Sequence, residues 1–440
     1  MDRLDVDVAI AGGGLCGLAL AVGLQERGID AHVFEKAPAL RTDSATAISM
    51  ALNGMRAVEG LKPGLSKEMY DLGLESDVKH IVRIEGKPQI TIPVDHKKGE
   101  FFMIGWRFSQ ELLASKLEAS RIHCNHRFMS YKPTEDGRGV DAEYLVATEG
   151  GHETRVVRAK VLIGADGLWS NMRKQMIGDT PRYLNFVNWN AMIYNPGGKV
   201  FKYAEGEVHM LHSADSNIVG YISDLGHGYV LWLLRILDED GSLAADFLDR
   251  SSGKKDAAVC KERALRHLNI PGWEDLRGAI EATDPELIYE RRSMDRAPLD
   301  KWSDCNGHAV LVGDAAHGMY SALGMGARTA FEDAHQLTLF LEEAFQAQDP
   351  STAISEAVSR FEEVRVERIK RIHTYATELT DRPQFMPNWT LNLTQKERVV
   401  RLNEFLLWTC QYPENPSYDP QSKNWGRILP HSDECQALEQ

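Results

Sequence analysis

The sequence predicts an α/β protein: a doubly wound domain that is interrupted by an inserted, mainly antiparallel β-sheet and followed by C-terminal helices. Three observations carry this prediction. The chain opens with an apolar strand, a glycine-rich turn, a helix and a second strand. Two later stretches repeat the order of strand, turn with glycine and aspartate, and helix. Between residues 71 and 103 and again between 182 and 237, short β-like runs take the place of helices. The second of these regions contains five such runs, separated by Gly, Asn and Asp turns: FVNWNAMIY, KVFKYA, EVHMLHS, NIVGYISD and GYVLWLLRIL.

Size, composition and charge are those of an ordinary globular protein. The 440 residues are long enough for two or three domains, and no internal repeat is visible. A net charge of −14 makes the surface repel phosphate polymers, so we expect no nucleic-acid partner. No stretch approaches the ~20 apolar residues of a membrane-spanning helix, and the first strand starts too close to Met1 for a signal peptide. We therefore expect a cytoplasmic protein without an integral membrane segment, whose six scattered cysteines form neither a disulfide framework nor a metal site.

The first element is DVDVAIAGGGLCGLALAVGLQERGIDAHVFEK, which starts at residue 5. Gly12, Gly14 and Gly17 follow a buried strand with the spacing GxGxxG, and apolar residues at helical spacing come next. In such a turn the first glycine permits the bend, the second lets a diphosphate approach the backbone, and the third lets helix and strand pack closely. Glu35 ends the second strand, where a carboxylate suits the ribose of an adenosine. The stretch predicts dinucleotide binding but does not distinguish NAD from FAD.

Two further stretches have the same design. KVLIGADGLWSNMRKQM, residues 160–176, is an apolar strand that ends at Asp166 and continues into a helix. Because Asp-Gly is also a common turn pair, a purely structural turn stays open for this stretch. GDAAHGMYSALGMGARTAFEDA, residues 313–334, places Asp314 after a strand and continues through a glycine-rich loop into a helix with an apolar face. The loop and the start of that helix contribute Gly324, Gly326 and Ala327.

These motifs, in this order, resemble the group A flavoprotein monooxygenases, which are single-component aromatic hydroxylases with the p-hydroxybenzoate hydroxylase fold, and among them the salicylate-hydroxylase-like branch. The resemblance rests on GxGxxG with its acidic residue, IGADGLWSNMR, and GDAAHGM…GMGARTAFEDA, and it covers roughly residues 5–345. It implies a glutathione-reductase-type Rossmann domain that binds FAD, with a substrate-binding sheet inserted into it. The implied boundaries are 1–70, 106–180 and 291–345 for the FAD-binding domain, 71–105 and 181–290 for the substrate domain, and 346–440 for a C-terminal helical region.

The resemblance also implies roles for particular residues at the cofactor. Asp314 would hydrogen-bond the ribityl hydroxyls of FAD, and the helix after the loop would point its N-terminus at the ring, where reduced flavin is negatively charged. Arg41 matches an arginine near the FAD ribose or the pyridine nucleotide, and Ala47 replaces a flavin-contacting glycine. The helix GWRFSQELLASKL carries the FAD contact on either Arg107 or Gln110, with Arg107 favoured. The expected cofactor residues are therefore Gly12, Gly14, Gly17, Glu35, Arg41, Ala47, Arg107, Asp166, Asp314, Gly324, Gly326 and Ala327.

The implied reaction uses NADH or NADPH and O2. Reduced FAD forms a C4a-hydroperoxide, which hydroxylates or epoxidises a small aromatic, polycyclic or isoprenoid metabolite. Tyr221 and Arg328 are the candidate catalytic residues; Asn190 replaces an arginine that the branch uses near its substrate, and His317 is expected to be structural. For four further candidates at the pocket, ordinary sheet packing or a surface position is the favoured interpretation: His209, His212, Trp232 and Arg235.

The loop departs from the family pattern His-Pro-Met-x-Pro-x-x-Gly-Gln-Gly. Gly318, Ser321 and Met325 stand at the Pro, Pro and Gln places, and the serine gives up the rigidity that the second proline confers. Two alternatives therefore stay open: an FAD-dependent dehydrogenase or reductase without oxygen insertion, and a non-catalytic flavin-binding protein. A halogenase is disfavoured, because no Gly-Trp-x-Trp-x-Ile-Pro stretch occurs. The expected partners are a small organic substrate and O2, and the expected assembly is a monomer or a homodimer.

Overall fold

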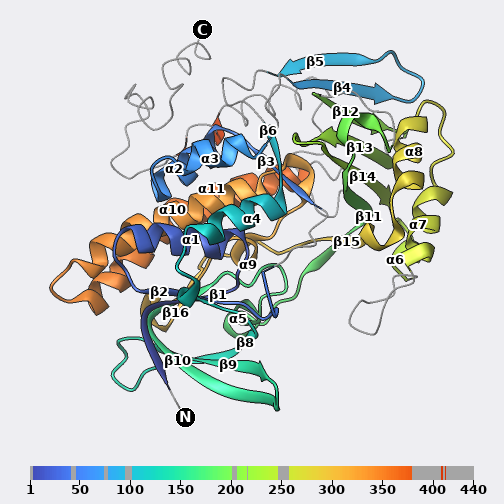
Figure 1. Cartoon of the computed structure of the whole chain (residues 1–440). Coiled ribbons are helices and arrows are strands. Elements are labelled where there is room, and N and C mark those ends of the chain that lie inside the picture. Colours follow the sequence, from blue (N-terminus) through green and yellow to red (C-terminus); the bar gives the residue numbers. More distant parts are fainter. Residues whose placement is uncertain are drawn as a thin grey trace, which may run out of the picture.

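The computed structural model describes residues 3–40, 46–73, 78–94, 102–200, 206–215, 217–245, 257–378, 408–409 and 412. Arg41, most of the run KVFKYA and most of the expected C-terminal region after Glu378 lie outside the described residues. The described part forms two large sheets, a two-stranded ribbon and a group of helices beside the ribbon (Figure 1). The ribbon pairs β3 (Ala47–Met50) with β6 (Phe102–Gly105). The helices near it are α1 (Leu15–Glu26), α2 (Leu52–Leu61), α3 (Leu65–Asp71), α4 (Trp106–Ser115), α10 (Gly326–Phe345) and α11 (Pro350–Glu378).

The first large sheet has a parallel centre in the order β17-β10-β1-β2-β7. The second half of its central strand β1, from Val8 to Ala11, is continuously apolar and buried, as expected for a strand covered on both faces. The short strand β16 and the β8–β9 hairpin add antiparallel neighbours to this centre. The bounds are β1 (Leu4–Ala11), β2 (Ala31–Phe34), β7 (Ile122–His123), β8 (His126–Pro133), β9 (Val140–Thr148), β10 (Gly151–Gly164), β16 (Ser303–Asp304) and β17 (Ala309–Leu311).

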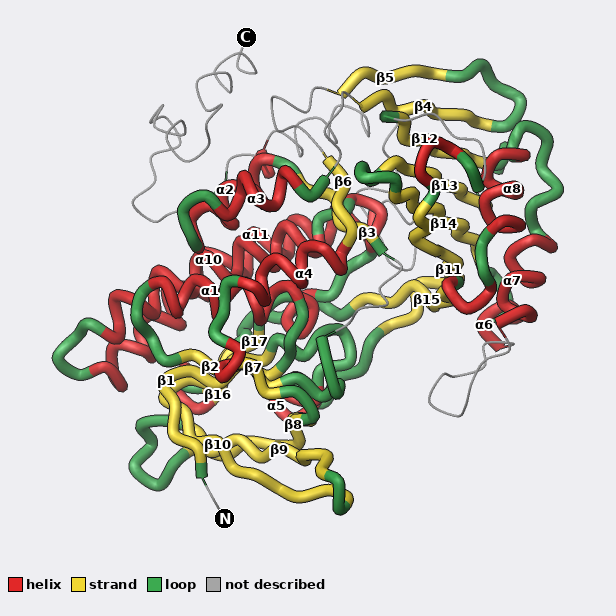
Figure 2. Tube along the Cα trace, viewed as in Figure 1, coloured by secondary structure: helices red, strands yellow, loops and turns green. Residues whose placement is uncertain are grey.

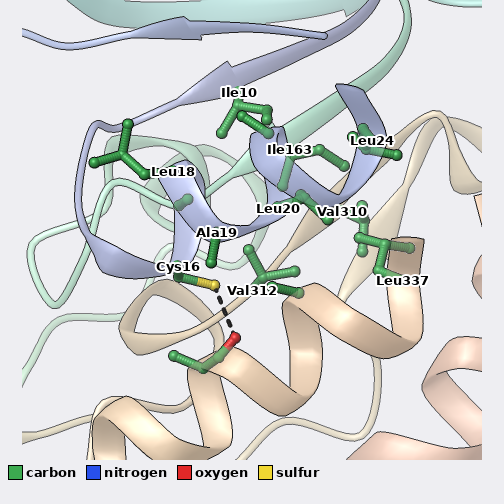
Figure 3. Close-up of a cluster of buried hydrophobic side chains, with 14 of the residues drawn as sticks. Ile10, Cys16, Leu18, Ala19, Leu20, Leu24, Ile163, Val310, Val312 and Leu337 are labelled. Atoms are coloured by element: carbon green, nitrogen blue, oxygen red, sulfur yellow. Dashed lines mark hydrogen bonds between the residues drawn. The ribbon is translucent and has the colours of Figure 1, made fainter. Parts of the chain in front are cut away.

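Helix α1 is the centre of the main hydrophobic core. Every residue from Leu15 to Leu24 is buried, because the sheet covers one side of the helix and α10 covers the other (Figure 3). The Cys16 thiol donates a hydrogen bond of 3.3 Å to the Ala330 carbonyl oxygen on α10. The turn that precedes α1 is therefore fixed against the start of α10.

The second large sheet has the order β15-β11-β14-β13-β12-β4-β5, and all its pairs are antiparallel except β12 with β4. Three helices cover one of its faces (Figure 2), where Trp189 and Trp232 are fully buried. The strands are β4 (Val78–Ile84), β5 (Ile90–Val94), β11 (Arg182–Tyr194), β12 (Glu207–His212), β13 (Ile218–Asp224), β14 (Tyr229–Leu237) and β15 (Tyr289–Asp295). The covering helices are α6 (Ser242–Ala245), α7 (Ala257–Arg266) and α8 (Glu274–Ala282).

The predicted fold class is confirmed. A parallel, helix-covered sheet carries an inserted and mainly antiparallel one, and long helices follow it. Four of the five β-like runs in the second half of the inserted region coincide with β11, β12, β13 and β14, because period-2 alternation is a local signal. In the part of the chain that the structure describes, none of the helices is long and apolar enough to cross a bilayer.

Candidate cofactor and substrate site

Three turns that are far apart in the sequence meet at one edge of the parallel sheet. Ala11, Gly164 and Leu311 lie side by side at the ends of β1, β10 and β17. Backbone hydrogen bonds continue this alignment into the turns: Ala165 N–H donates to the Ala11 carbonyl (2.9 Å), and Val312 N–H donates to the Gly164 carbonyl (3.0 Å). The carboxyl ends of parallel strands are where open α/β sheets bind ligands.

The three glycines of the first turn have different structural roles. Gly12 has a φ of +116°, and a Cβ on it would lie 2.4 Å from the Ala165 carbonyl oxygen. A Cβ on Gly17 would lie 2.1 Å from the Gly12 carbonyl oxygen, so both positions require glycine for packing. A Cβ on Gly14 would meet nothing within 4 Å. Gly14 is the N-cap of α1 without a side-chain cap, which leaves the first N–H groups of the helix available to an anion.

We expect the substitutions Gly17→Ala and Gly14→Ala to separate packing from ligand binding. Gly17→Ala should destabilise the protein by about 1–3 kcal/mol or more, because the new methyl overlaps the Gly12 carbonyl. Gly14→Ala should leave the melting temperature of the apoprotein unchanged, since its φ of −75° suits alanine. Its methyl would fill the space open to a diphosphate and weaken FAD binding by at least about tenfold.

Melting temperatures and FAD titrations of the two apoproteins check this expectation. Gly278→Ala on α8, where a Cβ also meets nothing within 4 Å, is the matched control. It should leave the FAD affinity unchanged and should not lower the melting temperature, because alanine suits a helix interior better than glycine. Equal FAD affinity of the Gly14→Ala and wild-type proteins would contradict the role given to Gly14.

Glu35 lies directly after β2, beside the first turn. One of its carboxylate oxygens accepts a hydrogen bond from Gly13 N–H (2.8 Å), and the other accepts one from Ala37 N–H (2.9 Å). Each carboxylate oxygen has a second lone pair, so the half-buried group can still accept hydroxyl donors. The structure thus fixes Glu35 at the turn and orients it through two backbone amides.

Helix α4 brings Gln110 into contact with the glycine-rich turn. The buried Gln110 amide donates to the Gly13 carbonyl (2.7 Å), and its own carbonyl oxygen is buried with no hydrogen-bond partner among the described residues. Arg107 Nε lies 3.5 Å from a Glu111 carboxylate oxygen, and its guanidinium lies over the Phe108 ring. The open acceptor on Gln110 makes it the better placed of the two candidates for a cofactor contact.

The second turn is held to the third by a buried arginine. Asp166 accepts hydrogen bonds from Asn171 N–H (2.8 Å) and Met172 N–H (3.2 Å) at the start of α5 (Asn171–Met176). Its other carboxylate oxygen is buried without a partner in the described chain, and burial raises the pKa of the group. From α5, fully buried Arg173 donates to the Ala316 carbonyl (2.6 Å) in the third turn. Asp166 therefore caps a helix and retains one oxygen for another donor.

Asp314 opens the third turn at the start of α9 (Asp314–His317). Its side chain is exposed, and none of the hydrogen bonds among the described residues involves its carboxylate. The pKa of this carboxyl is nevertheless raised, first by desolvation and also by Asp333, although His317 lowers it. An exposed carboxylate without such a hydrogen bond is open to hydroxyl donors.

The loop after α9 is held at its far end by Arg328. A Cβ on Gly326, the first residue of α10, would lie 3.9 Å from an Asp314 carboxylate oxygen. The loop therefore returns to the edge of the sheet where the three turns meet (the cofactor edge). Arg328 is 4% exposed and donates to the carbonyls of Gly324 (3.1 Å) and Leu323 (3.2 Å) and to the Ser49 hydroxyl (3.1 Å). Ser49 also donates to the Gly324 carbonyl (3.0 Å). The sequence interpretation missed Ser49, although β-strand alternation places it on the same face of β3 as Ala47.

A buried ionic network links the third turn to α10 and α11. His317 Nε2 lies 2.5 Å from a carboxylate oxygen of Asp333, which also accepts from Gly313 N–H (2.9 Å). Arg365 donates to Asp333 (2.9 Å) and to Glu332 (2.6 Å), and all these ionic side chains are at most 1% exposed. His317 is thus a structural residue in the observed geometry, as the sequence interpretation favours.

The face of the second sheet that lies opposite α7 and α8 turns toward the loop and the ribbon. A Cβ on Gly105 would lie 3.1 Å from the Met192 sulfur, and the rings of Phe186 and Tyr320 are stacked at 5.6 Å. Tyr221 packs there beside Met103 and Leu231. Alternation along the strands also places Asn190 and His212 on this face.

The other candidates lie on different faces of the second sheet, because successive side chains of a strand point to opposite faces. His209 contacts Asp275 of α8 (3.9 Å), and Trp232 donates to Thr283 (2.9 Å), so both lie on the helix-covered face. This agrees with the sheet-packing interpretation favoured for them. Arg235 lies on the opposite face and reaches the loop after α9.

The residues at this edge fit FAD. Four features lie at the meeting point of the three turns: the exposed carboxylate of Asp314, the open acceptor of Gln110, the uncapped start of α1 and the open space at Gly14. The Asp314 carboxylate can bind hydroxyls, and the Gln110 oxygen can accept from an N–H or hydroxyl donor. The start of α1, with the space at Gly14, can bind a diphosphate. The family model described as "FAD binding domain" matches residues 5–258. The chain belongs to this FAD-binding domain family. FAD is accordingly its cofactor.

Known relatives of this FAD-binding protein cover most of its length. It is 29% identical over 379 residues to the aurachin C monooxygenase/isomerase of Stigmatella aurantiaca, covering 83% of this chain and 86% of that protein. It is 26% identical to the chloroplastic zeaxanthin epoxidase of Prunus armeniaca over 84% of this chain, but it spans only 54% of that longer protein. The crystal structure of Klebsiella pneumoniae HpxO with FAD and uric acid has the same fold, with a TM-score of 0.70, 21% identity and coverage of 92% and 96% of the two chains.

Proposed function

We propose that this protein is an FAD-dependent monooxygenase that uses NADH or NADPH and O2 to hydroxylate or epoxidise a small aromatic, polycyclic or isoprenoid metabolite. The observation that carries the proposal is the meeting of three glycine-containing turns at one sheet edge. The face of the mainly antiparallel sheet that lies opposite α7 and α8 turns toward the loop of the third turn. The relatives support it, since one is named a monooxygenase/isomerase and the other an epoxidase.

The residues that would hold FAD follow from the site. The start of α1 would bind the diphosphate and Glu35 the adenosine ribose, while Asp314 would bind the ribityl hydroxyls. When bound, the flavin supplies the redox chemistry, accepting hydride and reacting with O2. Gln110 serves as the further contact at the turn in place of Arg107. Gly324, Gly326 and Ala327, in the loop and at the start of α10, would contact the flavin ring, and Asp166 and Ala47 would be further cofactor contacts.

Tyr221 and Arg328 act by donating hydrogen bonds and not as bases. Burial raises the pKa of Tyr221 to about 12, although a hydrogen bond with Ser223 lowers it, so the phenol keeps its proton at neutral pH. A protonated tyrosine on the face of the sheet that lies opposite α7 and α8 can donate a hydrogen bond to a substrate oxygen. Arg328 holds the loop in shape through Gly324 and Leu323, which makes it a positioning residue.

Substrate-stimulated oxidation of NADH and NADPH, measured over a panel of aromatic and isoprenoid compounds, tests this function. The panel is run under isotopically labelled O2, and the expected result is a product that carries one labelled oxygen atom. Substrate-dependent coenzyme oxidation without label in the product would instead establish a dehydrogenase or reductase. FAD binding without coenzyme oxidation by any compound in the panel would favour a non-catalytic flavin-binding protein.

A further inference from the structure

The loop between α9 and α10 contacts the second sheet through apolar packing around Tyr320 and through hydrogen bonds from one arginine, Arg235. Arg235 on β14 is 8% exposed and donates to Tyr320 Oη (2.8 Å) and Ser321 Oγ (2.9 Å). Its guanidinium also lies over the Tyr320 ring at 4.7 Å. The third contact, to Asn188 Oδ1 (2.8 Å) on β11, fixes the orientation of the guanidinium within the sheet. Arg235 therefore joins two strands of the substrate sheet to the middle of the loop.

This connection reaches the cofactor edge. The loop begins at Gly318, whose N–H donates to the Asp314 carbonyl (3.1 Å), and ends at Gly326, next to the Asp314 carboxylate. Its far end is held by Arg328 and Ser49 from the cofactor side. Arg235 holds its middle from the side of the second sheet, where the Phe186 ring also stacks on Tyr320. The side chain of Arg235 supplies the polar part of this contact between sheet and loop.

Ser321 stands at the place where the resembling family has a stiffening proline. It is the first residue of a short 3-10 helix, Ser321–Leu323, and the preceding Tyr320 has a φ of −59° and a ψ of 130°. That backbone is the one that proline requires at the first position of a helical turn and in the residue before it. The loop thus keeps a proline-compatible shape while a hydrogen bond from Arg235 occupies the serine hydroxyl.

We propose that Arg235 is a positioning residue: its hydrogen bond to Ser321 takes over the loop-stiffening role of the absent proline and sets the distance between the substrate sheet and the flavin. The part of this inference that concerns catalysis rests on the proposed function, whereas the stiffening of the loop does not. Proline stiffens a chain by restricting φ, and hydrogen bonds from a buried guanidinium stiffen it by anchoring the side chains of Tyr320 and Ser321. If the two devices are equivalent, proline at position 321 should make Arg235 dispensable.

The experiment compares Arg235→Met, Ser321→Ala, Ser321→Pro and the double variant Arg235→Met/Ser321→Pro as FAD-loaded proteins. Hydrogen–deuterium exchange of the peptide spanning residues 318–326 is expected to be about tenfold faster in Arg235→Met and faster in Ser321→Ala, the scale of losing a hydrogen bond to a charged group. The double variant should return to the wild-type rate. Arg83→Met, which removes an arginine that contacts Asp275 and Gly272 on the helix-covered side, is the control and should leave this peptide unchanged.

A second readout concerns the proposed reaction. With the active compound from the substrate panel, Arg235→Met should release a severalfold larger share of the consumed coenzyme as hydrogen peroxide, and Ser321→Pro in the double variant should restore product formation. Unchanged loop exchange in both Arg235→Met and Ser321→Ala, or no rescue by proline, would overturn the positioning role. If Arg235→Met does not fold, Ser321→Ala and Ser321→Pro decide the same point. Failure of the wild-type protein to form product would reject the proposed function while the exchange data still judge the loop.

Discussion

Asp314→Ala is expected to give a folded protein that purifies with little or no FAD. The exposed Asp314 carboxylate lies at the edge where the three turns meet, and none of the hydrogen bonds in the described part of the chain occupies it. A hydrogen bond to a charged group contributes about 1.5–3 kcal/mol, so each lost contact should raise the Kd for FAD by roughly 10–150-fold. The flavin absorbance of the purified protein and an FAD titration of the apoprotein measure this effect.

A second substitution at this position, Asp314→Asn, tests whether the carboxylate is kept for binding at the expense of stability. Desolvation and Asp333 raise the pKa of Asp314 in the folded protein above its ordinary value, against the lowering effect of His317. A raised carboxyl pKa means that stability is lost as the pH rises through the ordinary value and up to the folded one. At neutral pH, the Asp314→Asn apoprotein should therefore melt at the same temperature as the wild-type apoprotein or higher. A destabilised Asp314→Asn apoprotein that still binds FAD at full affinity would reverse the assignment from binding to structure.

Arg365→Met is expected to destabilise the protein by about 3–5 kcal/mol, the usual cost of breaking a buried ion pair from one side. Arg365 donates to Glu332 and Asp333, and all three side chains are 0% exposed. Its removal leaves Asp333 with His317 and Glu332 with Arg368, each short of one charge partner. Because Asp333 also accepts from Gly313 N–H, we expect FAD affinity to fall together with stability.

The pH dependence of this loss follows from Glu332. Burial raises its pKa, but Arg368 and Arg365 outweigh burial and lower the pKa from 4.5 to about 2. A depressed carboxyl pKa contributes stability above its ordinary value that is lost as the pH falls toward the folded one. The difference in melting temperature between wild type and Arg365→Met should therefore be largest near neutral pH and shrink between about pH 4.5 and 2.

Arg360→Met is the matched control for Arg365→Met. Arg360 lies on the same helix and pairs with Glu343 at 2.7 Å, but both side chains are about half exposed. Exposed pairs contribute about 0–1 kcal/mol, so this variant should melt close to the wild type at every pH. Equal losses of stability in the two arginine variants would show that the buried network contributes no more to stability than the exposed pair. Scans at one heating rate keep the comparison valid even if unfolding is irreversible.

The departure at Ser321 shows how far the sequence could lead at the loop. The missing proline indicates a loop that has lost a local constraint, and the backbone at Tyr320 and Ser321 does keep the shape that proline would require. The replacement constraint comes from Arg235, 86 residues earlier in the chain. A contact of that separation depends on which strand of the second sheet faces the loop, and local patterns do not specify this.

Gln110 and Arg107 show the same limit on a helix. Their separation of three residues places both side chains on one side of α4, so periodicity cannot choose between them. The packing of α4 against α1 brings Gln110 to the Gly13 carbonyl, while Arg107 turns to Glu111 and Phe108. Likewise, alternation shows that Trp232 and Arg235 point to opposite faces of β14, but it does not tell which face the helices cover.

The sequence by itself determined the elements whose cause is local. These are the strand, turn and helix around Gly12, Gly14 and Gly17, the alternating strands of the second sheet, and the glycine-rich loop after Asp314, since sterics and period act within a few residues. Only the tertiary structure decided which side chains meet at the cofactor edge and what holds the loop. Strand order, helix packing and the burial of the ionic network between α10 and α11 bring together residues from distant parts of the chain, and their energies depend on desolvation that exists only in the folded protein.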